Sequence, residues 1–311
     1  MSAKSKALTA SQRSALSPSD RTLQLIDDAT APTTQRVYES VLRTFGDWLD
    51  ERSIDDLAIA EHLTDLHAQG KSVARCALLL ASLNHFAKRN GQPSPIGKLA
   101  QSTLAGIRRQ AKPTRQARGI GWRDADLMVA VADQQLSVAA KRDAAMIALA
   151  SDALLRVSEV VALDVDDLTT ADDGSGRLTI RRSKTDQHAQ GKVLFVGKPT
   201  MRRIRDWQAH AGVWDGRLFR RLSKAGNVIG DSLSPQSARA IIRTRAAAVK
   251  IDGDVNGHSL RVGSAQSLAE HGCELPALME VGRWKSAAMP AHYARGQLAA
   301  RSAVAKLRYA R

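Results

Sequence analysis

Apolar residues in the first third of the chain recur at helical spacing. After Thr33 and Thr34, either of which can cap a helix, one helical face collects Val37, Val41, Leu42, Phe45, Trp48 and Leu49. Similar patterns predict helices at about 58–69, 72–90 and 98–111. Turn-forming residues, including Gly70 and the segment 90–97, separate these helices. We therefore expect a small all-helical domain over residues 20–113, preceded by a disordered basic tail at residues 1–19.

The rest of the chain combines helical patterns with two short segments of strand character. Residues 114–121 lack an apolar period and contain two glycines, so we expect a linker there. Helical patterns follow at about 123–133, 137–150, 199–211, 235–249, 258–271 and 274–281. The β-branched segments 176–183 and 192–197 predict a hairpin with Lys184 at its loop end. Residues 122–311 should form a second domain, mainly α with a small β-sheet, ending in an amphipathic helix at about 297–308.

Composition places the protein among ordinary globular chains and excludes several classes. Of its 311 residues, 43% are hydrophobic and 25% are charged, which argues against wholesale disorder. No apolar run approaches the roughly 18 residues of a membrane span, and the first residues lack the apolar core of a signal peptide. Cys76 and Cys273 lie far apart without CxxC spacing, so neither a disulfide framework nor a zinc module is indicated. We expect a cytoplasmic protein without membrane association.

The charge of the chain is strongly positive and unevenly distributed. There are 46 Lys and Arg against 31 Asp and Glu, a net charge of +15. Residues 66–123 contain eleven basic residues and no acid, and residues 281–311 contain seven basic residues and no acid. Such segregation favours a polyanionic partner over a charge that serves only solubility. The candidates for DNA contact are Lys71, Arg75, Lys88, Arg89, Arg108, Arg109, Arg115, Arg118, Arg239, Arg243 and Arg245.

Motifs for nucleotide or metal chemistry are absent from the sequence. There is no GxxxxGK[ST] or GxGxxG loop, and the eight histidines show no HExxH spacing. No carboxylate cluster suggests two-metal catalysis. We therefore expect no cofactor and no metal, so that any chemistry on phosphate would use the cationic side chains of the protein itself.

One segment offers such cations next to a nucleophile. His258 and Arg261 lie three residues apart at the start of a predicted helix, where both could reach the same phosphate. Trp284 and Tyr293 follow in a basic, loop-containing region. A phenol with a pKa of about 10 needs neighbouring cations or a base to act as a nucleophile. Taken alone, His258 and Arg261 could also be a solvated basic pair, and Trp284 and Tyr293 could be packing aromatics without a catalytic role.

Five segments, taken in order, resemble the tyrosine recombinases of the phage integrase family. They are LLRVSEVVALDVDDL at 154–168, SKTD at 183–186, HSLR at 258–261, GRW at 282–284 and HY at 292–293. The chain is particularly similar to members of this family that have Trp at the position of Trp284, where most members have His. One departure is Leu154 with Leu155 before the first arginine, where many members have Gly-Leu. The resemblance covers nearly the whole chain and implies a SAM-like core-binding domain, a catalytic domain and a C-shaped clamp on DNA.

The resemblance carries functional residues over to seven positions, namely Arg156, Glu159, Lys184, His258, Arg261, Trp284 and Tyr293. The two arginines would clamp the scissile phosphate and stabilise its transition state. The acid would orient the first arginine or the histidine, although a simple ion pair is the alternative. The hairpin lysine, with Lys192 as the competing candidate, would protonate the leaving oxygen. The histidine would assist proton removal from the tyrosine or hold the phosphate, and the indole N–H would donate to a phosphate oxygen.

The reaction implied by the resemblance exchanges one phosphodiester for another. Attack by Tyr293 would give a 3′-phosphotyrosyl link and a free 5′-hydroxyl, which requires neither ATP nor metal. The implied partners are double-stranded DNA with an inverted-repeat site and further copies of the chain in a homotetramer on DNA, joined through the C-terminal helix. Such a recombinase would be nucleoid-associated and encoded by a bacterium, phage or plasmid. The alternatives are a type IB topoisomerase-like relaxing enzyme and a non-catalytic DNA-binding factor.

Overall fold

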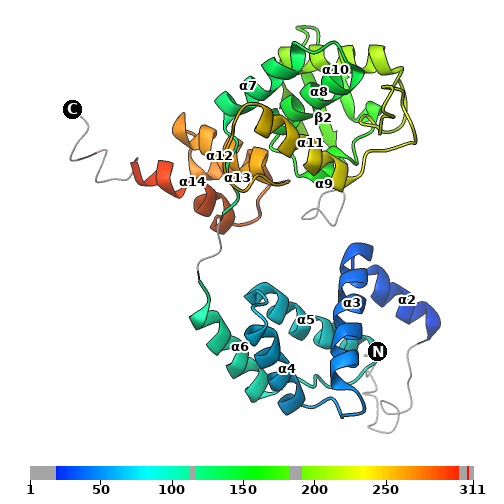
Figure 1. Ribbon diagram of the computed structural model, residues 1–311, viewed down its shortest axis with the longest axis vertical. Helices are drawn as coiled ribbons and strands as arrows, with labels where there is room; N and C mark the ends of the chain where they lie inside the picture. Colours follow the sequence, from blue (N-terminus) through cyan, green and yellow to red (C-terminus); the bar gives the residue numbers. More distant parts are fainter. Residues whose placement is uncertain (1–18, 113–115, 182–190, 301–306, 308–311) are drawn as a thin grey trace, which may run out of the picture. The chain divides into compact units, whose positions relative to one another are not determined.

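The chain divides between Thr114 and Arg115 into two units (Figure 1). Each unit is built around its own apolar core. The computed structural model describes residues 19–112, 116–181, 191–300 and 307. Within these residues, no helix combines the length and the hydropathy needed to cross a bilayer. The architecture is mainly α-helical, with one small antiparallel sheet in the C-terminal unit.

The N-terminal unit is a group of helices around an apolar core. Its described helices are α2 (Asp20–Asp28), α3 (Pro32–Leu49), α4 (Asp56–Ala68), α5 (Val73–Arg89) and α6 (Lys98–Gln110). Phe45, Leu63 and Leu79 are among the buried side chains that α3, α4 and α5 contribute. The sequence pattern did not predict α2, which is attached to α5 by a salt bridge of 2.6 Å between Asp27 and Arg89.

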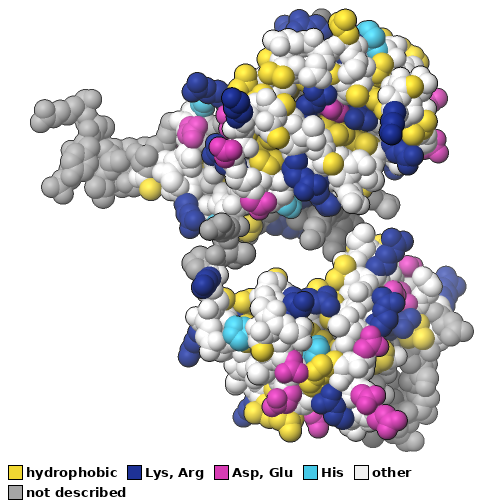
Figure 2. All heavy atoms as spheres, in the orientation of Figure 1, with side chains coloured by type: hydrophobic (Ala, Val, Ile, Leu, Met, Phe, Trp, Pro, Cys, Tyr) yellow, Lys and Arg dark blue, Asp and Glu magenta, His cyan; other side chains and the backbone are white. Residues whose placement is uncertain are grey.

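Acidic and basic side chains occupy different parts of this unit. The exposed acids Asp47, Asp50, Glu51 and Asp55 lie where α3 ends and α4 begins. Figure 2 shows acidic side chains gathered at the lower end of this unit. The last turn of α6 instead carries basic side chains, which belong to the first acid-free run. The charge segregation in the sequence is therefore kept on the surface of the folded unit.

The C-terminal unit surrounds two central helices. Its helices are α7 (Trp122–Asp133), α8 (Val138–Asp152), α9 (Val157–Val160), α10 (Lys198–Ala211), α11 (Pro235–Ala248), α12 (Ser259–Glu270), α13 (Leu275–Gly282) and α14 (Ala288–Ala300). Both α8 and α12 bury residues around most of their circumference, which small side chains allow. Gly263 on α12 illustrates the tight packing, because an added Cβ would lie 2.0 Å from the carbonyl of Ile120. The segment before α7 is thereby laid directly on α12.

A three-stranded sheet interrupts the helical pattern after α9. A 3-10 turn (Val165–Asp167) leads into β1 (Leu168–Thr170), which is followed by β2 (Gly176–Ile180) and β3 (Lys192–Val196). The strands are antiparallel in the order β1-β2-β3, with Leu178 opposite Leu168 and Leu194. The hairpin predicted from the sequence corresponds to β2 and β3, whereas β1 is too short to show a period.

Candidate active site

A tight turn after α8 presents the first candidate arginine. Leu154 adopts a left-handed conformation (φ 48°), and Arg156 then forms the N-cap of α9. Glu159 accepts hydrogen bonds from the Arg156 backbone N–H at 2.8 Å and from its guanidinium at 2.6 Å. One carboxylate therefore fixes both the backbone and the side chain of this arginine, which is more than the simple ion pair considered from the sequence.

Arg261 is the second arginine, and its residue is only 2% exposed. Its two terminal nitrogens donate to the carbonyls of Leu154 and Gly282. Its guanidinium carbon lies 4.3 Å from the centroid of the Trp284 ring, a cation–π arrangement. Arg261 is thus held from three sides, by the turn after α8, the end of α13 and the indole.

A third arginine, which the sequence reasoning missed, completes the cluster. Arg283 follows α13 in a left-handed conformation (φ 57°), and its side chain is only 6% exposed. It donates to Glu159 at 2.7 Å and to the carbonyls of Ala153 and Leu154 at 3.0 and 3.1 Å. In the sequence, Arg283 is visible only as a cation beside Trp284 in the GRW segment. The acid that it contacts, Glu159, lies 124 positions earlier in the chain.

The arginine cluster (Arg156, Arg261 and Arg283) has an excess of positive charge. Burial, together with the charges of Arg156 and Arg283, lowers the pKa of Arg261 to about 9, and Glu159 and Tyr293 act in the opposite direction. Burial raises the pKa of Glu159, but the neighbouring arginines outweigh it and lower that pKa below its usual value. Glu159 is therefore ionised near neutral pH, and three guanidiniums share one carboxylate. A bound anion would relieve their mutual repulsion.

The candidate nucleophile lies on α14, beside this cluster. Tyr293 and Trp284 are in edge contact, with ring centroids 6.0 Å apart and an interplanar angle of 63°. The helix is seated on α12 by Ala294 and by a hydrogen bond of 3.3 Å from Gln266 to the Tyr293 carbonyl. The sequence placed Tyr293 in a loop-containing region, whereas the structure gives it a helical position within electrostatic reach of Arg261.

The two other expected catalytic residues are His258 and Lys184. His258 is the exposed N-cap residue of α12, three positions before Arg261, and its backbone N–H donates to Asn256 at 2.9 Å. Lys184 belongs to residues 182–190, outside the described part of the chain. Its competitor Lys192 forms a salt bridge of 3.1 Å with Glu280. The contacts thus unite Arg156, Glu159, Arg261, Trp284 and Tyr293, with Arg283 added.

The candidate DNA-contacting residues differ in their exposure and in their pairing with acids. The exposed ones are Lys71, Lys88, Arg108, Arg109, Arg118, Arg239 and Arg243, while Arg75 is half-buried. Arg118 is paired with Asp124 at 3.6 Å, Arg89 with Asp27 at 2.6 Å and Arg245 with Asp143 at 2.8 Å. Of these three side chains, only that of Arg245, at 11% exposed, is largely buried. Arg115 lies outside the described residues.

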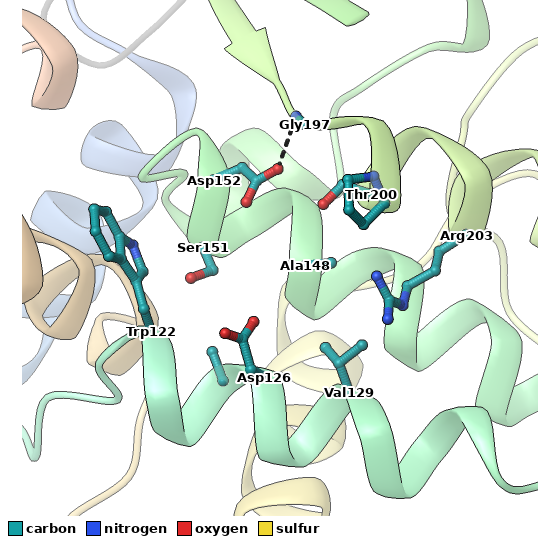
Figure 3. A pocket seen from close by; sticks show the side chains of 11 residues that line it. Trp122, Asp126, Val129, Ala148, Ser151, Asp152, Gly197, Thr200 and Arg203 are labelled. Atoms are coloured by element: carbon teal, nitrogen blue, oxygen red, sulfur yellow. Dashed lines mark hydrogen bonds between the residues drawn. The ribbon is translucent and has the colours of Figure 1, made fainter. Parts of the chain in front are cut away.

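A pocket of about 330 Å³ opens elsewhere in the C-terminal unit, between α7, α8 and the start of α10 (Figure 3). Asp126, Asp152 and Arg203 line it, and Asp152 accepts a hydrogen bond of 3.0 Å from the Gly197 N–H. Desolvation raises the pKa of Asp152 against the effect of its hydrogen bonds. None of the expected site residues that the structure describes lines this pocket, so it is separate from the arginine cluster.

Comparisons with known proteins place this arrangement among recombinases. The model of the phage integrase family matches residues 123–299, which include every member of the arginine cluster and Tyr293. The recombinase Cre of Escherichia phage P1 is 27% identical over 84% of this chain and 83% of its own length. The tyrosine recombinase XerC of Pseudomonas fluorescens is 31% identical over 84% of this chain and 83% of its own length.

Solved structures support the same fold at low sequence identity. The integrase of transposon Tn1549 in complex with transposon right end DNA matches with a TM-score of 0.64 at 13% identity, covering 89% of this chain and 98% of that one. The recombinase XerH bound to a palindromic difH substrate matches with a TM-score of 0.63 at 15% identity, covering 86% and 78%. The likeness extends over both units of the chain.

Proposed function

Because this chain belongs to the phage integrase family of tyrosine recombinases, we propose that it is a site-specific DNA recombinase whose nucleophile is Tyr293. The observation that carries the proposal is the arginine cluster, which holds more positive than negative charge beside a half-buried tyrosine. A scissile phosphate is the anion that suits such a site, because guanidiniums bind two phosphate oxygens in one plane.

In the proposed cleavage, the phenolic oxygen of Tyr293 attacks the phosphorus of a DNA phosphodiester. The bond from phosphorus to the 5′ oxygen breaks, leaving a 3′-phosphotyrosyl link and a 5′-hydroxyl. Arg156 and Arg261 stabilise the charge that develops on the non-bridging oxygens. Trp284 packs against Arg261. Together with the two arginines it contacts the phosphate, by donating its indole N–H to a phosphate oxygen. Because the phosphoester bond is exchanged and not hydrolysed, the step consumes no nucleotide, and the guanidiniums take the role that a metal ion has in other phosphoryl transfers.

Two proton transfers accompany this exchange. His258, at the start of α12, receives or relays the phenolic proton of Tyr293, or holds the phosphate. Lys184 gives a proton to the departing 5′ oxygen. The reverse step uses a 5′-hydroxyl from a second duplex, which completes strand exchange. Glu159 stays ionised and acts by orienting Arg156, consistent with its lowered pKa.

The partners that we propose are double-stranded DNA with inverted repeats and three further copies of the chain. XerH and the Tn1549 integrase bind DNA in the structures compared above. The two units would clamp the duplex in a C shape, with the exposed basic residues on phosphates and bases. The C-terminal segment from Gln297 onward, which includes the end of α14 and otherwise lies almost wholly outside the described residues, would dock on the neighbouring copy, giving a tetramer that acts in the cytoplasm on the nucleoid.

Covalent trapping tests this proposal. A pool of nicked duplexes that tile the DNA beside the encoding gene should yield a protein–DNA adduct, stable in denaturing gels, with the wild-type chain. Tyr293→Phe should abolish the adduct and leave DNA affinity unchanged. Tyr38→Phe is the matched control, because that residue lies in α3 and its ring contacts His85 at 5.2 Å. An adduct that persists in Tyr293→Phe would contradict the assignment.

A second readout separates recombination from relaxation. A supercoiled plasmid carrying two copies of the trapped site should give recombinant products with the wild-type chain. Relaxed plasmid without recombinants would instead indicate the topoisomerase-like activity. Binding without any adduct would indicate a DNA-binding factor.

A further inference from the structure

Arg283 connects two left-handed turns that bear the candidate catalytic groups. One turn contains Leu154 (φ 48°) and leads into Arg156, and the other contains Arg283 itself (φ 57°) and leads into Trp284. A residue with a side chain keeps such a conformation only where its surroundings enforce it. The Arg283 guanidinium supplies contacts that do so, because it binds the carbonyls of Ala153 and Leu154.

The same guanidinium also completes the coordination of Glu159. One carboxylate oxygen of Glu159 accepts from the Arg156 guanidinium at 2.6 Å, and the other accepts from Arg283 at 2.7 Å. The side chains of Glu159 and Arg283 are 4% and 6% exposed, so water competes little for either. Rotation of this carboxylate would move Arg156, and the bond to Arg283 opposes that rotation.

Arg283 is not placed to bind a phosphate itself. Both of its terminal nitrogens are engaged by Glu159 and by backbone carbonyls. Its remaining nitrogen, Nε, is buried and has no hydrogen-bond partner among the described residues. An external phosphate would have to displace the ionised Glu159 from Arg283. Arg261, by contrast, would exchange only neutral backbone carbonyls, and the Arg156 side chain is 15% exposed and bound on one edge by Glu159.

We propose that Arg283 is a positioning residue for DNA cleavage, which locks the turn of Arg156 to the turn of Trp284 through Glu159 and the carbonyls of Ala153 and Leu154. The proposal rests on the recombinase function proposed above. Arg261 donates to Leu154 and Gly282, one residue in each turn, so the lock also fixes the second arginine. Arg283 thereby sets the spacing of both phosphate-binding guanidiniums.

The test replaces Arg283 by Gly, which adopts the left-handed conformation without strain and removes only the side chain. Under single-turnover conditions, we expect Arg283→Gly to cleave the trapped site about 100-fold more slowly, because catalytic groups displaced by about 1 Å lose that much rate. DNA affinity should stay within about 2-fold, since one buried cation contributes little among many phosphate contacts. The matched control is Lys250→Gly, at another left-handed position (φ 56°) with an exposed cation, and it should cleave like the wild type.

The pH profile gives a readout that a loss of packing would not change. Among the described residues, the groups that shift the pKa of Arg261 are Arg156, Arg283, Glu159 and Tyr293, and the Trp284 ring covers one face. Removing Arg283 takes away one like charge, which raises the pKa of Arg261 from about 9. The alkaline fall in the cleavage rate should therefore begin at higher pH in Arg283→Gly than in the wild type. A variant that is slower by the same factor at every pH would overturn the positioning role.

Arg283→Lys decides the case if the Gly variant does not fold. Lysine keeps the charge but lacks the planar fork that reaches a carboxylate and two carbonyls together. We expect slow cleavage with retained DNA binding, and wild-type cleavage by either variant would overturn the inference. Absence of any adduct with the wild-type chain would overturn the proposed function instead, so the two failures are distinguishable.

Discussion

Around Glu159, the physical chemistry of single residues explains how a protein interior tolerates three guanidiniums. Glu159 forms ion pairs with Arg156 and Arg283. Backbone carbonyls accept hydrogen bonds from Arg261 and Arg283 but do not neutralise their charge. Desolvation of such charges is costly unless hydrogen bonds replace the lost water. The site therefore stores an unfavourable interaction that an arriving phosphate would relieve, which makes the resting cluster preorganised for an anion.

Replacing the shared carboxylate should destabilise the C-terminal unit. In the folded chain the pKa of Glu159 lies below its usual value, so the ionised form contributes stability above the unfolded pKa of about 4.3. This contribution is lost as the pH falls through the lower, folded pKa. We expect Glu159→Gln to lower the free energy of unfolding by about 3 kcal/mol at pH 7, because it leaves buried arginines unpaired.

Urea unfolding at pH 7 and near pH 3 measures this effect, and the difference from the wild type should shrink at the lower pH. Glu280→Gln is the control. Glu280 pairs with Lys192 but is 70% exposed, so its loss should cost less than about 1 kcal/mol at either pH. Equal losses in the two variants would mean that Glu159 is an ordinary surface partner.

Among the elements, α12 positions more of the site than any sequence motif on it indicates. Its first turn carries Arg261, its middle receives the segment before α7 at Gly263, and its last turns support α14. The Ile120 N–H donates to the Ser259 carbonyl at 2.8 Å, and Gly263 leaves no room for a Cβ beside that segment. Small residues on α12 therefore determine how closely the segment before α7 approaches the site.

Filling this contact should destabilise the unit without touching the catalytic groups. In Gly263→Ala the new Cβ would meet backbone atoms of Ile120 at 2.0 Å, so the segment or the helix must shift. We expect a loss of about 1–3 kcal/mol in the free energy of unfolding, the usual cost of overpacking. The matched control is Gly296→Ala on α14, where an added Cβ meets nothing within 4 Å and helix propensity should favour alanine. Thermal unfolding of both variants checks this, and equal melting temperatures would contradict the tight contact.

The elements also show what the sequence could and could not predict. Long amphipathic helices such as α3 and α5 follow from their apolar period, because one face of each is buried. The short α9 and β1 span only four and three residues, too few for a period. On α14, Ala and Gly replace large apolar residues, so the helix that carries Tyr293 was not predicted.

The candidate site was predictable to a different degree than the fold. Arg156 and Tyr293 were singled out because residue type, order and spacing match a known family. Arg283 was missed because its role depends on contacts with Ala153 and Glu159, which a single sequence does not reveal. A left-handed backbone at Arg283 and Leu154 is likewise a product of tertiary packing.

At the scale of the whole molecule, the net charge overstates the number of cations that can face DNA. The two acid-free runs hold 18 basic residues, and the remaining 222 residues sum to a charge of −3. The structure shows that some basic side chains are largely buried in ion pairs, such as Arg245 with Asp143 and Arg283 with Glu159. Electrostatic attraction to DNA therefore depends on an exposed subset, and neighbouring arginines on one helix can belong to different subsets.

Helix α11 provides a direct comparison of the two kinds of arginine. Arg243 is exposed, and none of the salt bridges found in the described part of the chain involves it. Arg245, two residues later, has a side chain that is only 11% exposed and is bound to Asp143 at 2.8 Å.

If Arg243 contacts phosphate, Arg243→Ala should weaken DNA binding and reduce the slope of log K against log salt by about 1. Arg245→Ala should leave that slope unchanged and lower the free energy of unfolding by about 2 kcal/mol, since a buried charge-assisted hydrogen bond is lost. Binding measured by fluorescence anisotropy between about 50 and 200 mM salt, with urea unfolding of the same variants, separates these outcomes. A reduced slope in Arg245→Ala would show that its pairing with Asp143 opens when DNA binds.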